Sequence, residues 1–313
     1  MEAMGFPGQP EVELIAWLGD WLAPEETDPY LIFNAFYFRD ATYMAFFARL
    51  LGFSQDIDRY ETIAEQTRIY WNRTFVDSVT GKTKCHDGRA CDAQGSYVIG
   101  LDCGVFDEAS HKAALSHLER TTRQGGYTVR TGFFGTGALN PMLSEGGYVQ
   151  AAYKTLTGTA CPGWLYPVTQ GATTVWERWN SFTREDGFGE HNAMNSFNHY
   201  SLGSVVAWLY ENVLGIRRDE KQPGYKHFYL RPEIGVLSCA EGAVQTPHGM
   251  IESAWKRADG KIMYRCRIPA NTSADLVLGE MRTHLGSGDY AFEVPDKPEV
   301  LNECRRIINT EQV

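Results

Sequence analysis

The sequence of 313 residues contains no run of about 18 or more apolar residues, so it predicts no membrane-spanning helix. It also lacks an excess of basic side chains, with 29 lysines and arginines against 39 aspartates and glutamates, a net charge of −10. An acidic balance argues against a nucleic-acid surface, which needs basic groups to neutralise phosphates. The first residues lack a basic segment followed by an apolar one, so we expect no secretory signal and favour a cytoplasmic location.

The cysteines predict neither a disulfide framework nor a metal site. Seven cysteines, an odd number, lie at irregular spacing, and no CxxC pair occurs. The stretch that holds Cys85, Cys91 and Cys103 therefore does not predict zinc, and we expect reduced thiols. The glycine-rich segment 132–137 has neither the GxGxxG nor the GK[ST] form, and instead predicts a tight loop entering a helix, close to a ligand or another backbone. These motifs thus predict no metal and no cofactor.

The apolar pattern changes near Pro223. With 43% apolar and 22% charged residues, the chain is expected to fold into about two globular domains. Before Pro223 the apolar spacing is helical, and after it short alternating segments are separated by turn residues. This pattern predicts stacked helical hairpins in residues 1–222 and a small β-sandwich in residues 223–313. The helices are expected at 30–51, 55–75, 94–101, 108–123, 136–144, 148–156 and 193–213, and the strands at 225–230, 250–255, 262–268, 274–278 and 290–294.

Aromatic residues make up 13% of the chain, and seven of the eight tryptophans lie before residue 223. Aromatic rings stack on the apolar faces of sugars, whereas carboxylates and amides bind sugar hydroxyls. The composition therefore fits a carbohydrate-active protein, and it fits a large aromatic core equally well.

The segment 162–200 carries the residues with the clearest chemistry. Glu177 lies between Trp176 and Trp179, where indole rings favour a neutral carboxyl and the neighbouring Arg178 favours a charged one. Such opposing effects are typical of a carboxyl used in acid–base catalysis, and the alternative is a buried Glu–Arg pair. His199, expected near the start of a helix, could donate to a substrate hydroxyl or satisfy a loop carbonyl.

Several ordered motifs together resemble glycoside hydrolase family 78, the α-L-rhamnosidases. They are Gly19–Leu22, Thr131–Leu139, Pro162–Pro167, Gly171–Trp179, Ser196–Tyr200 and the tail from Pro223 to Pro232, and the resemblance covers roughly residues 12–285. It implies an (α/α)6 barrel followed by a β-sandwich, and inverting hydrolysis of terminal α-L-rhamnosyl residues. It also implies Glu177 as the general base, His199 as a rhamnose contact, and Trp164, Trp176 and Trp179 as aromatic residues of the sugar pocket.

The sequence departs from the family pattern in one respect. The family's general acid belongs to a DCPQRDE-like motif, and no such string occurs here, while Asp20 and Asp186 match no acid motif. We therefore expect a barrel that is incomplete at its N-terminus, a truncated and weakly active enzyme, and self-association across an open barrel edge. The expected ligand is a rhamnose-containing oligosaccharide or glycoside. The alternatives are a non-catalytic rhamnoside-binding fragment, another (α/α)6 glycosidase, or a polysaccharide lyase.

Overall fold

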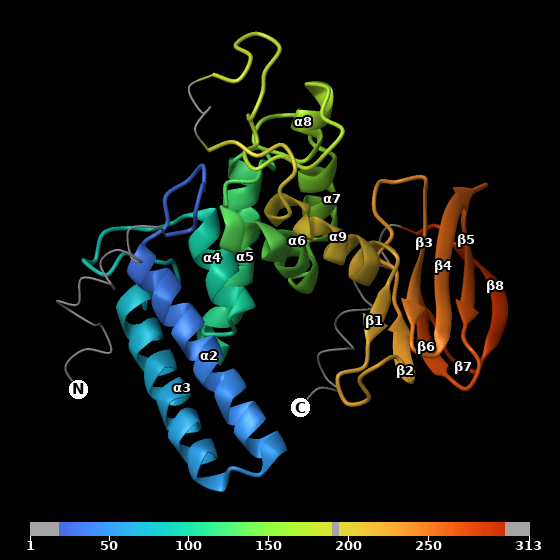
Figure 1. The fold of residues 1–313 in the computed structure, drawn as a ribbon, viewed down its shortest axis with the longest axis horizontal. Coiled ribbons are helices and arrows are strands. Elements are labelled where there is room, and N and C mark those ends of the chain that lie inside the picture. The colour runs from blue at the N-terminus through green and yellow to red at the C-terminus, as the bar shows by residue number, and fades with distance from the viewer. Residues whose placement is uncertain (1–18, 190–193, 298–313) are drawn as a thin grey trace. The chain divides into compact units, whose positions relative to one another are not determined.

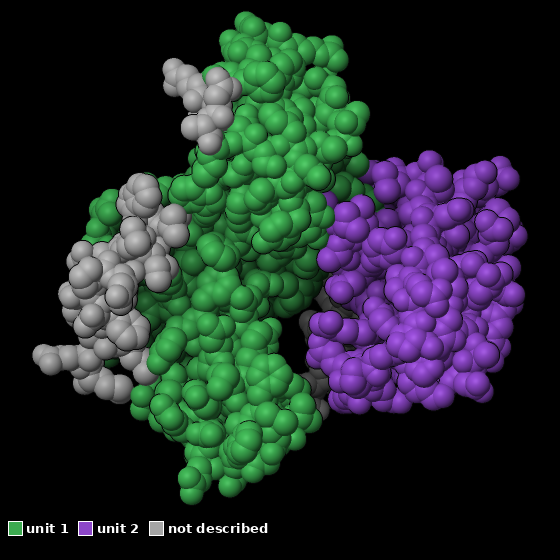
Figure 2. Space-filling model, in the orientation of Figure 1, with its two compact units in different colours: residues 1–204 green, residues 205–313 purple. Residues whose placement is uncertain are grey.

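The chain divides into two compact units, residues 1–204 and residues 205–313 (Figure 2). The computed structural model describes residues 19–189 and 194–297. The first unit is helical, and the second consists of two β-sheets preceded by short helical turns. The predicted fold class, a helical-hairpin domain followed by an all-β domain, is confirmed. Within the described residues, no helix has both the length and the apolar character needed to cross a bilayer.

An antiparallel hairpin of α2 (Pro29–Leu51) and α3 (Ser54–Phe75) begins the described part of the first unit (Figure 1). The carboxylate of Asp28 accepts the Tyr30 N–H at 2.8 Å and caps α2. Gly52, with a φ of +80°, ends the helix in the left-handed conformation that glycine adopts most readily. The buried Trp71 indole of α3 donates to the Leu31 carbonyl of α2 at 3.0 Å and joins the base of the hairpin.

The remaining helices of the first unit pack around α4 (Gln94–Asp102), which is buried over almost its whole length. Gly100 allows this close packing, because a Cβ there would lie only 2.6 Å from the Phe106 ring. The other helices are α5 (Glu108–Gln124), α6 (Phe133–Glu145), α7 (Val149–Thr157) and the short α8 (Leu165–Thr169), followed by a 3-10 turn at Ser201–Ser204. The predicted helices before residue 160 are confirmed to within a few residues, whereas α8 was not predicted.

The helix expected at residues 193–213 is wrong over 194–200, and residue 193 lies outside the described residues. This segment pairs with residues 174–177 instead. The Glu177 N–H donates to the Ser196 carbonyl at 2.9 Å, and the His199 N–H donates to the Val175 carbonyl at 2.8 Å. These long-range bonds use backbone groups that a helix would need, so tertiary pairing overrides the apolar periodicity. Helical structure resumes with the 3-10 turn at Ser201–Ser204 and continues in the second unit with α9 (Val205–Trp208) and a π-helical turn, Leu209–Val213.

The second unit contains two four-stranded sheets, with strand orders β1-β2-β6-β7 and β3-β4-β5-β8. The β2–β6 pair is parallel and the other pairs are antiparallel. Alternate residues of both sheets, such as Phe228, Leu276 and Tyr264, are buried and form the core of the unit. The strands are β1 (Ile216–Arg218), β2 (His227–Leu230), β3 (Cys239–Thr246), β4 (Gly249–Ala258), β5 (Lys261–Ile268), β6 (Ser273–Leu278), β7 (Met281–Leu285) and β8 (Gly288–Pro295).

All five predicted strands are present, and β1, β3 and β7 are additional. Of these, β1 pairs with β2 although it precedes Pro223. The expected domain boundary after residue 222 stays a prediction.

The Asp92 carboxylate lies in a cluster of polar side chains beside α4. These contacts are expected to make the stability of the fold sensitive to acid. The carboxylate accepts from the Tyr97 hydroxyl at 2.6 Å and from Arg120, and it pairs with Lys82 at 2.9 Å. Burial raises the pKa of Asp92, but the bonds from Tyr97, Lys82 and Arg120 outweigh it and lower the pKa to about 2. Because the folded-state pKa lies below the unfolded value, the cluster stabilises the fold above about pH 4 and loses this contribution as the pH falls through about 2.

We therefore expect Asp92→Asn to lower the free energy of unfolding at pH 7 by about 1–2 kcal/mol. The difference from the parent should shrink toward zero as the pH falls to about 2. Urea unfolding across this pH range measures it, with Asp40→Asn, at an exposed position on α2, as the control. A destabilisation that is constant with pH would show that Asp92 acts through packing rather than through its charge.

Candidate active site

A cavity of about 250 Å³ lies in the first unit. Its walls come from the loop that precedes α2, the start of α6, the segment around residue 161 and the segment 177–180. This volume is a little below the range of about 300–1,000 Å³ typical of ligand pockets, so the cavity suits a small ligand or one ring of a larger one. The lining residues include Leu22, Phe133, Cys161, Glu177, Trp179 and Asn180.

Glu177 presents a buried carboxylate at this cavity. The side chain is only 8% exposed, and its Oε2 accepts the Ser196 N–H at 2.7 Å. The backbone N–H of Glu177 donates in turn to the Ser196 carbonyl at 2.9 Å, so the two segments hold each other in register. Among the described residues, only Oε2 has a hydrogen-bond partner. The other oxygen, Oε1, can therefore accept a proton or a hydroxyl from a ligand.

Arg178 does not pair with Glu177. Its Nε donates to the Met194 carbonyl at 3.1 Å, and the described part of the chain shows no ion pair between the two side chains. The alternative interpretation of Glu177, as half of a buried Glu–Arg pair, is therefore wrong.

The three predicted tryptophans occupy different positions around the cavity. Trp179 is buried and lines it. Trp164 packs edge-to-face against Trp179, with 5.7 Å between ring centroids, and its indole N–H donates to the Leu202 carbonyl at 2.8 Å. Trp176 is buried against the Phe197 ring at 5.3 Å and is not among the lining residues. Trp179 thus provides a wall of the cavity, Trp164 supports it, and Trp176 packs away from the lining.

His199 lies in the segment before the 3-10 turn rather than at the start of a helix. Its half-buried ring packs on Phe133, with 4.8 Å between centroids, and Phe133 lines the cavity. The Nδ1 atom accepts the Ser201 N–H at 3.3 Å. A neutral ring that accepts at Nδ1 carries its proton on Nε2, which leaves Nε2 able to donate to a ligand.

The glycine-rich segment 132–137 enters α6 against another stretch of backbone, as predicted. A Cβ on Gly132 would lie 2.3 Å from the Trp21 carbonyl oxygen and 2.4 Å from that of Asp20. The Asp20 carboxylate accepts the N–H groups of Gly132, Phe134 and Gly135 at 2.7, 2.9 and 3.3 Å. Burial raises the pKa of Asp20 more than these three bonds lower it. Asp20 therefore holds the start of α6, and with it Phe133, in place.

We expect Gly132→Ala to displace the start of α6, because the clashing atoms are backbone rather than flexible side chains. Overpacking of this kind lowers the free energy of unfolding by about 1–3 kcal/mol. Gly203→Ala is the matched control, since the nearest atom to its Cβ would be 3.4 Å away on the Val175 side chain. Thermal unfolding of both variants measures the difference. Equal stability of the two would show that the Asp20–Gly132 contact does not constrain α6.

Sequence reasoning did not identify every residue of the cavity. Asn180 directly follows the WERW motif and Phe133 directly follows Gly132, so proximity to a motif could have indicated both. Leu22 ends the motif Gly19–Leu22 and Cys161 directly precedes the motif Pro162–Pro167, but the sequence does not show that the fold brings these two motifs to the same cavity.

Comparisons with known proteins agree on one family. The model of the bacterial alpha-L-rhamnosidase 6 hairpin glycosidase domain matches residues 9–213, and that of the bacterial alpha-L-rhamnosidase C-terminal domain matches residues 215–292. An alpha-L-rhamnosidase of Streptomyces avermitilis is 34% identical over 260 residues, which are 82% of this chain and 24% of the relative. One of an Alteromonas species is 32% identical over 275 residues, covering 83% of this chain and 29% of the relative.

Solved structures show the same likeness. The alpha-L-rhamnosidase of Streptomyces avermitilis, complexed with L-rhamnose, has a TM-score of 0.79 and 31% identity, covering 88% of this chain and 28% of that one. The enzyme of Aspergillus terreus has a TM-score of 0.79 and 29% identity, covering 88% and 33%. The present chain thus spans about a quarter to a third of the length of these relatives.

Proposed function

We propose, because the chain belongs to the family of bacterial alpha-L-rhamnosidases with a six-hairpin glycosidase domain, that its first unit binds and helps to hydrolyse terminal α-L-rhamnosyl residues. The observation that carries the proposal is the buried Glu177 carboxylate at the wall of a cavity of about 250 Å³, next to the Trp179 ring. The ligand is a rhamnose-containing oligosaccharide or glycoside.

The proposed mechanism is inverting hydrolysis with Glu177 as the general base. Glu177 takes a proton from a water molecule while that water attacks the anomeric carbon and the glycosidic C–O bond breaks. A carboxylic acid on the other face of the sugar, roughly 6.5–9.5 Å away, protonates the leaving oxygen. The Ser196 N–H fixes the Glu177 carboxylate through Oε2 at 2.7 Å, which leaves Oε1 for the water.

We assign no general acid to this chain. The carboxylate oxygens of Asp20 accept backbone N–H groups at the start of α6, and Asp186 lies exposed in a turn. A general acid typically contributes about 10²–10⁴-fold in rate. Because the sequence holds no DCPQRDE-like motif, we expect the chain alone to bind L-rhamnose and to turn over rhamnosides slowly.

The other proposed site residues act on the sugar ring and its hydroxyls. Trp179 offers a ring face to the apolar C–H groups of the sugar and Trp164 supports it, whereas Trp176 packs on Phe197 behind the lining. His199 donates from Nε2 to a sugar hydroxyl.

His199→Ala is therefore expected to raise the Kd for L-rhamnose by about tenfold or more, since such a hydrogen bond contributes on the order of 1–3 kcal/mol. Isothermal titration measures the Kd. His111→Ala on α5 is the control, because that ring is partly exposed and contacts Glu145. Unchanged affinity in His199→Ala would make His199 a structural residue of the loop.

Two assays test the function. Release of p-nitrophenol from the α-L-rhamnoside is measured for the chain alone and for a hybrid in which the chain replaces the matching region of the Streptomyces avermitilis relative. NMR at early times then identifies the anomer released by the hybrid, and inversion predicts the β-anomer. A hybrid that binds rhamnose but does not turn over would support the non-catalytic alternative. Cleavage of a different p-nitrophenyl glycoside would support another six-hairpin glycosidase.

A further inference from the structure

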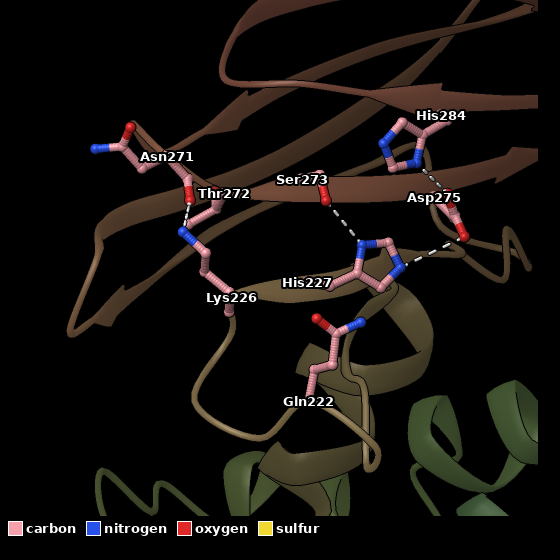
Figure 3. Close-up of a pocket in the computed structure, with 8 residues that line it drawn as sticks. All are labelled: Gln222, Lys226, His227, Asn271, Thr272, Ser273, Asp275 and His284. Atoms are coloured by element: carbon pink, nitrogen blue, oxygen red, sulfur yellow. Dashed lines mark hydrogen bonds and ion pairs between the residues drawn. The ribbon is translucent and has the colours of Figure 1, made fainter.

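A second hollow, of about 550 Å³, lies in the β unit on the sheet β1-β2-β6-β7 (Figure 3). Its walls come from β2, β6, β7 and the two turns that precede β2 and β6. Among the described residues, every one that lines it has a polar or charged side chain, and none is aliphatic or carries a phenyl or indole ring. A hollow within the usual size range of ligand sites and with this lining suits a ligand rich in hydrogen-bonding groups.

Strand register builds a charged cluster at the centre of this hollow. His227 on β2 lies opposite Ser273 on β6, and Asp275 on β6 lies opposite His284 on β7. Ser273 and Asp275 are two residues apart, so both face the same side of the sheet. The intervening Ala274 is fully buried on the other side. The register therefore fixes which side chains meet in the hollow.

Asp275 lies between the two imidazoles. His284 Nδ1 lies 2.7 Å from one Asp275 oxygen, and His227 Nε2 lies 3.4 Å from the other. His227 Nδ1 contacts the Ser273 hydroxyl at 3.0 Å, and the two imidazole rings stack with 5.9 Å between centroids. The cluster is a preformed set of donors and acceptors, held on three adjacent strands (Figure 3).

The groups at the rim of the hollow add further hydrogen-bonding capacity. The Lys226 ammonium donates to the backbone carbonyl of Asn271. This hydrogen bond stabilises the turn before β6. The side-chain amide of Asn271 projects away from this contact in Figure 3. Amides, imidazoles and a carboxylate pair well with neighbouring sugar hydroxyls, each of which both donates and accepts. The central carboxylate disfavours an anionic ligand.

We propose that this hollow is a second saccharide-binding site, which takes a neutral, hydroxyl-rich sugar and is distinct from the cavity at Glu177. Asp275 and the two histidines bind hydroxyls at its centre, and the Asn271 amide binds at its rim. The site goes beyond the proposed hydrolysis and does not depend on it, because none of its residues lines the first cavity.

The test uses the complete chain labelled with ¹⁵N and observes the histidine ring resonances by NMR during titration with the neutral disaccharide rutinose. The resonances of His227 and His284 should shift and saturate. That of His248, exposed in the turn between β3 and β4, should stay unchanged. The same shifts should persist in Glu177→Gln and with no hydrolysis, which separates this site from the proposed function.

Asn271→Gly tests the role of the Asn271 amide most directly. Asn271 has a φ of +60°, a conformation that glycine adopts without strain, so the change removes the amide and keeps the turn. It should weaken rutinose binding at the two histidines by roughly tenfold. Asp259→Gly is the matched control, since Asp259 is exposed at a φ of +52° in the turn between β4 and β5.

Three outcomes would overturn the proposal. One is the absence of any shift of His227 and His284 with rutinose. Another is an equal affinity of Asn271→Gly and the parent. The third is a response to inorganic phosphate or to oligogalacturonate alone, which would identify a site for anions.

Discussion

Glu177→Gln should lower kcat by about 10²–10⁴-fold in the hybrid with the Streptomyces avermitilis relative, while the Kd for L-rhamnose stays within a few-fold of the parent. The amide keeps the shape of the side chain, and its oxygen can still accept the Ser196 N–H that now binds Oε2. It cannot accept a proton from water, so the loss falls on the chemical step. Hydrolysis of p-nitrophenyl α-L-rhamnoside measures kcat, and isothermal titration measures the Kd.

Glu185→Gln is the matched control for this change. Glu185 lies exposed in the same loop region, outside the cavity lining, so its variant should keep full activity. Turnover by Glu177→Gln that equals that of the control would assign the general base elsewhere. A loss of rhamnose binding together with turnover would instead make Glu177 a binding residue.

The chain alone should self-associate through the far end of the α2–α3 hairpin. Large apolar side chains cover this end, including Phe47, Leu50 and Leu51, with exposed fractions of 50%, 70% and 66%. They follow one another at helical spacing near the C-terminus of α2, so they form a continuous patch rather than scattered residues. Extensive exposed apolar patches drive association, and burying each such side chain contributes about 1.5–3 kcal/mol.

Sedimentation velocity measures this association. The double variant Phe47→Lys/Leu50→Lys should shift the chain to the monomer at concentrations where the parent is oligomeric. Val79→Lys is the control, because Val79 is 90% exposed but lies in a loop away from the hairpin tip. A parent chain that sediments as a monomer at all concentrations would contradict the proposed association.

Local sequence signals predicted the helices of the first unit well. The helices at 30–51 and 55–75 follow from apolar spacing interrupted by Gly52, and the structure begins and ends them within one residue. The same reasoning fails at 194–200, where a helical pattern is overridden by hydrogen bonds to residues 174–177. Local sequence patterns cannot predict such hydrogen bonds, because their partners lie about 20 residues away in sequence.

Three strands, β1, β3 and β7, were not predicted because their own sequences carry little apolar pattern. In β3, the sequence CAEGAVQT has few large apolar residues, and most of its side chains are at least partly exposed. Strand β1 has only three residues, and β7, with the sequence MRTHL, has apolar residues only at its two ends. Pairing with longer neighbours stabilises these strands, and a periodicity argument does not detect it.

The candidate site was predictable where its residues belong to one continuous motif. Glu177 and Trp179 lie within WERW, and both line the cavity. The separation of roles among Trp164, Trp176 and Trp179 was not predictable, because it depends on ring packing in three dimensions. The role of Asp20 was hidden for the same reason, since its hydrogen-bond partners are more than 100 residues away.

A crystal structure of this chain with bound L-rhamnose tests whether Glu177 and Trp179 form the rhamnose site. We expect the sugar to lie in the cavity of about 250 Å³, against the Trp179 ring. The Glu177 carboxylate should lie about 3 Å from a sugar hydroxyl or from a water next to the anomeric carbon. Rhamnose bound elsewhere, with this cavity holding only water that does not contact Glu177, would show that the cavity is not the rhamnose site.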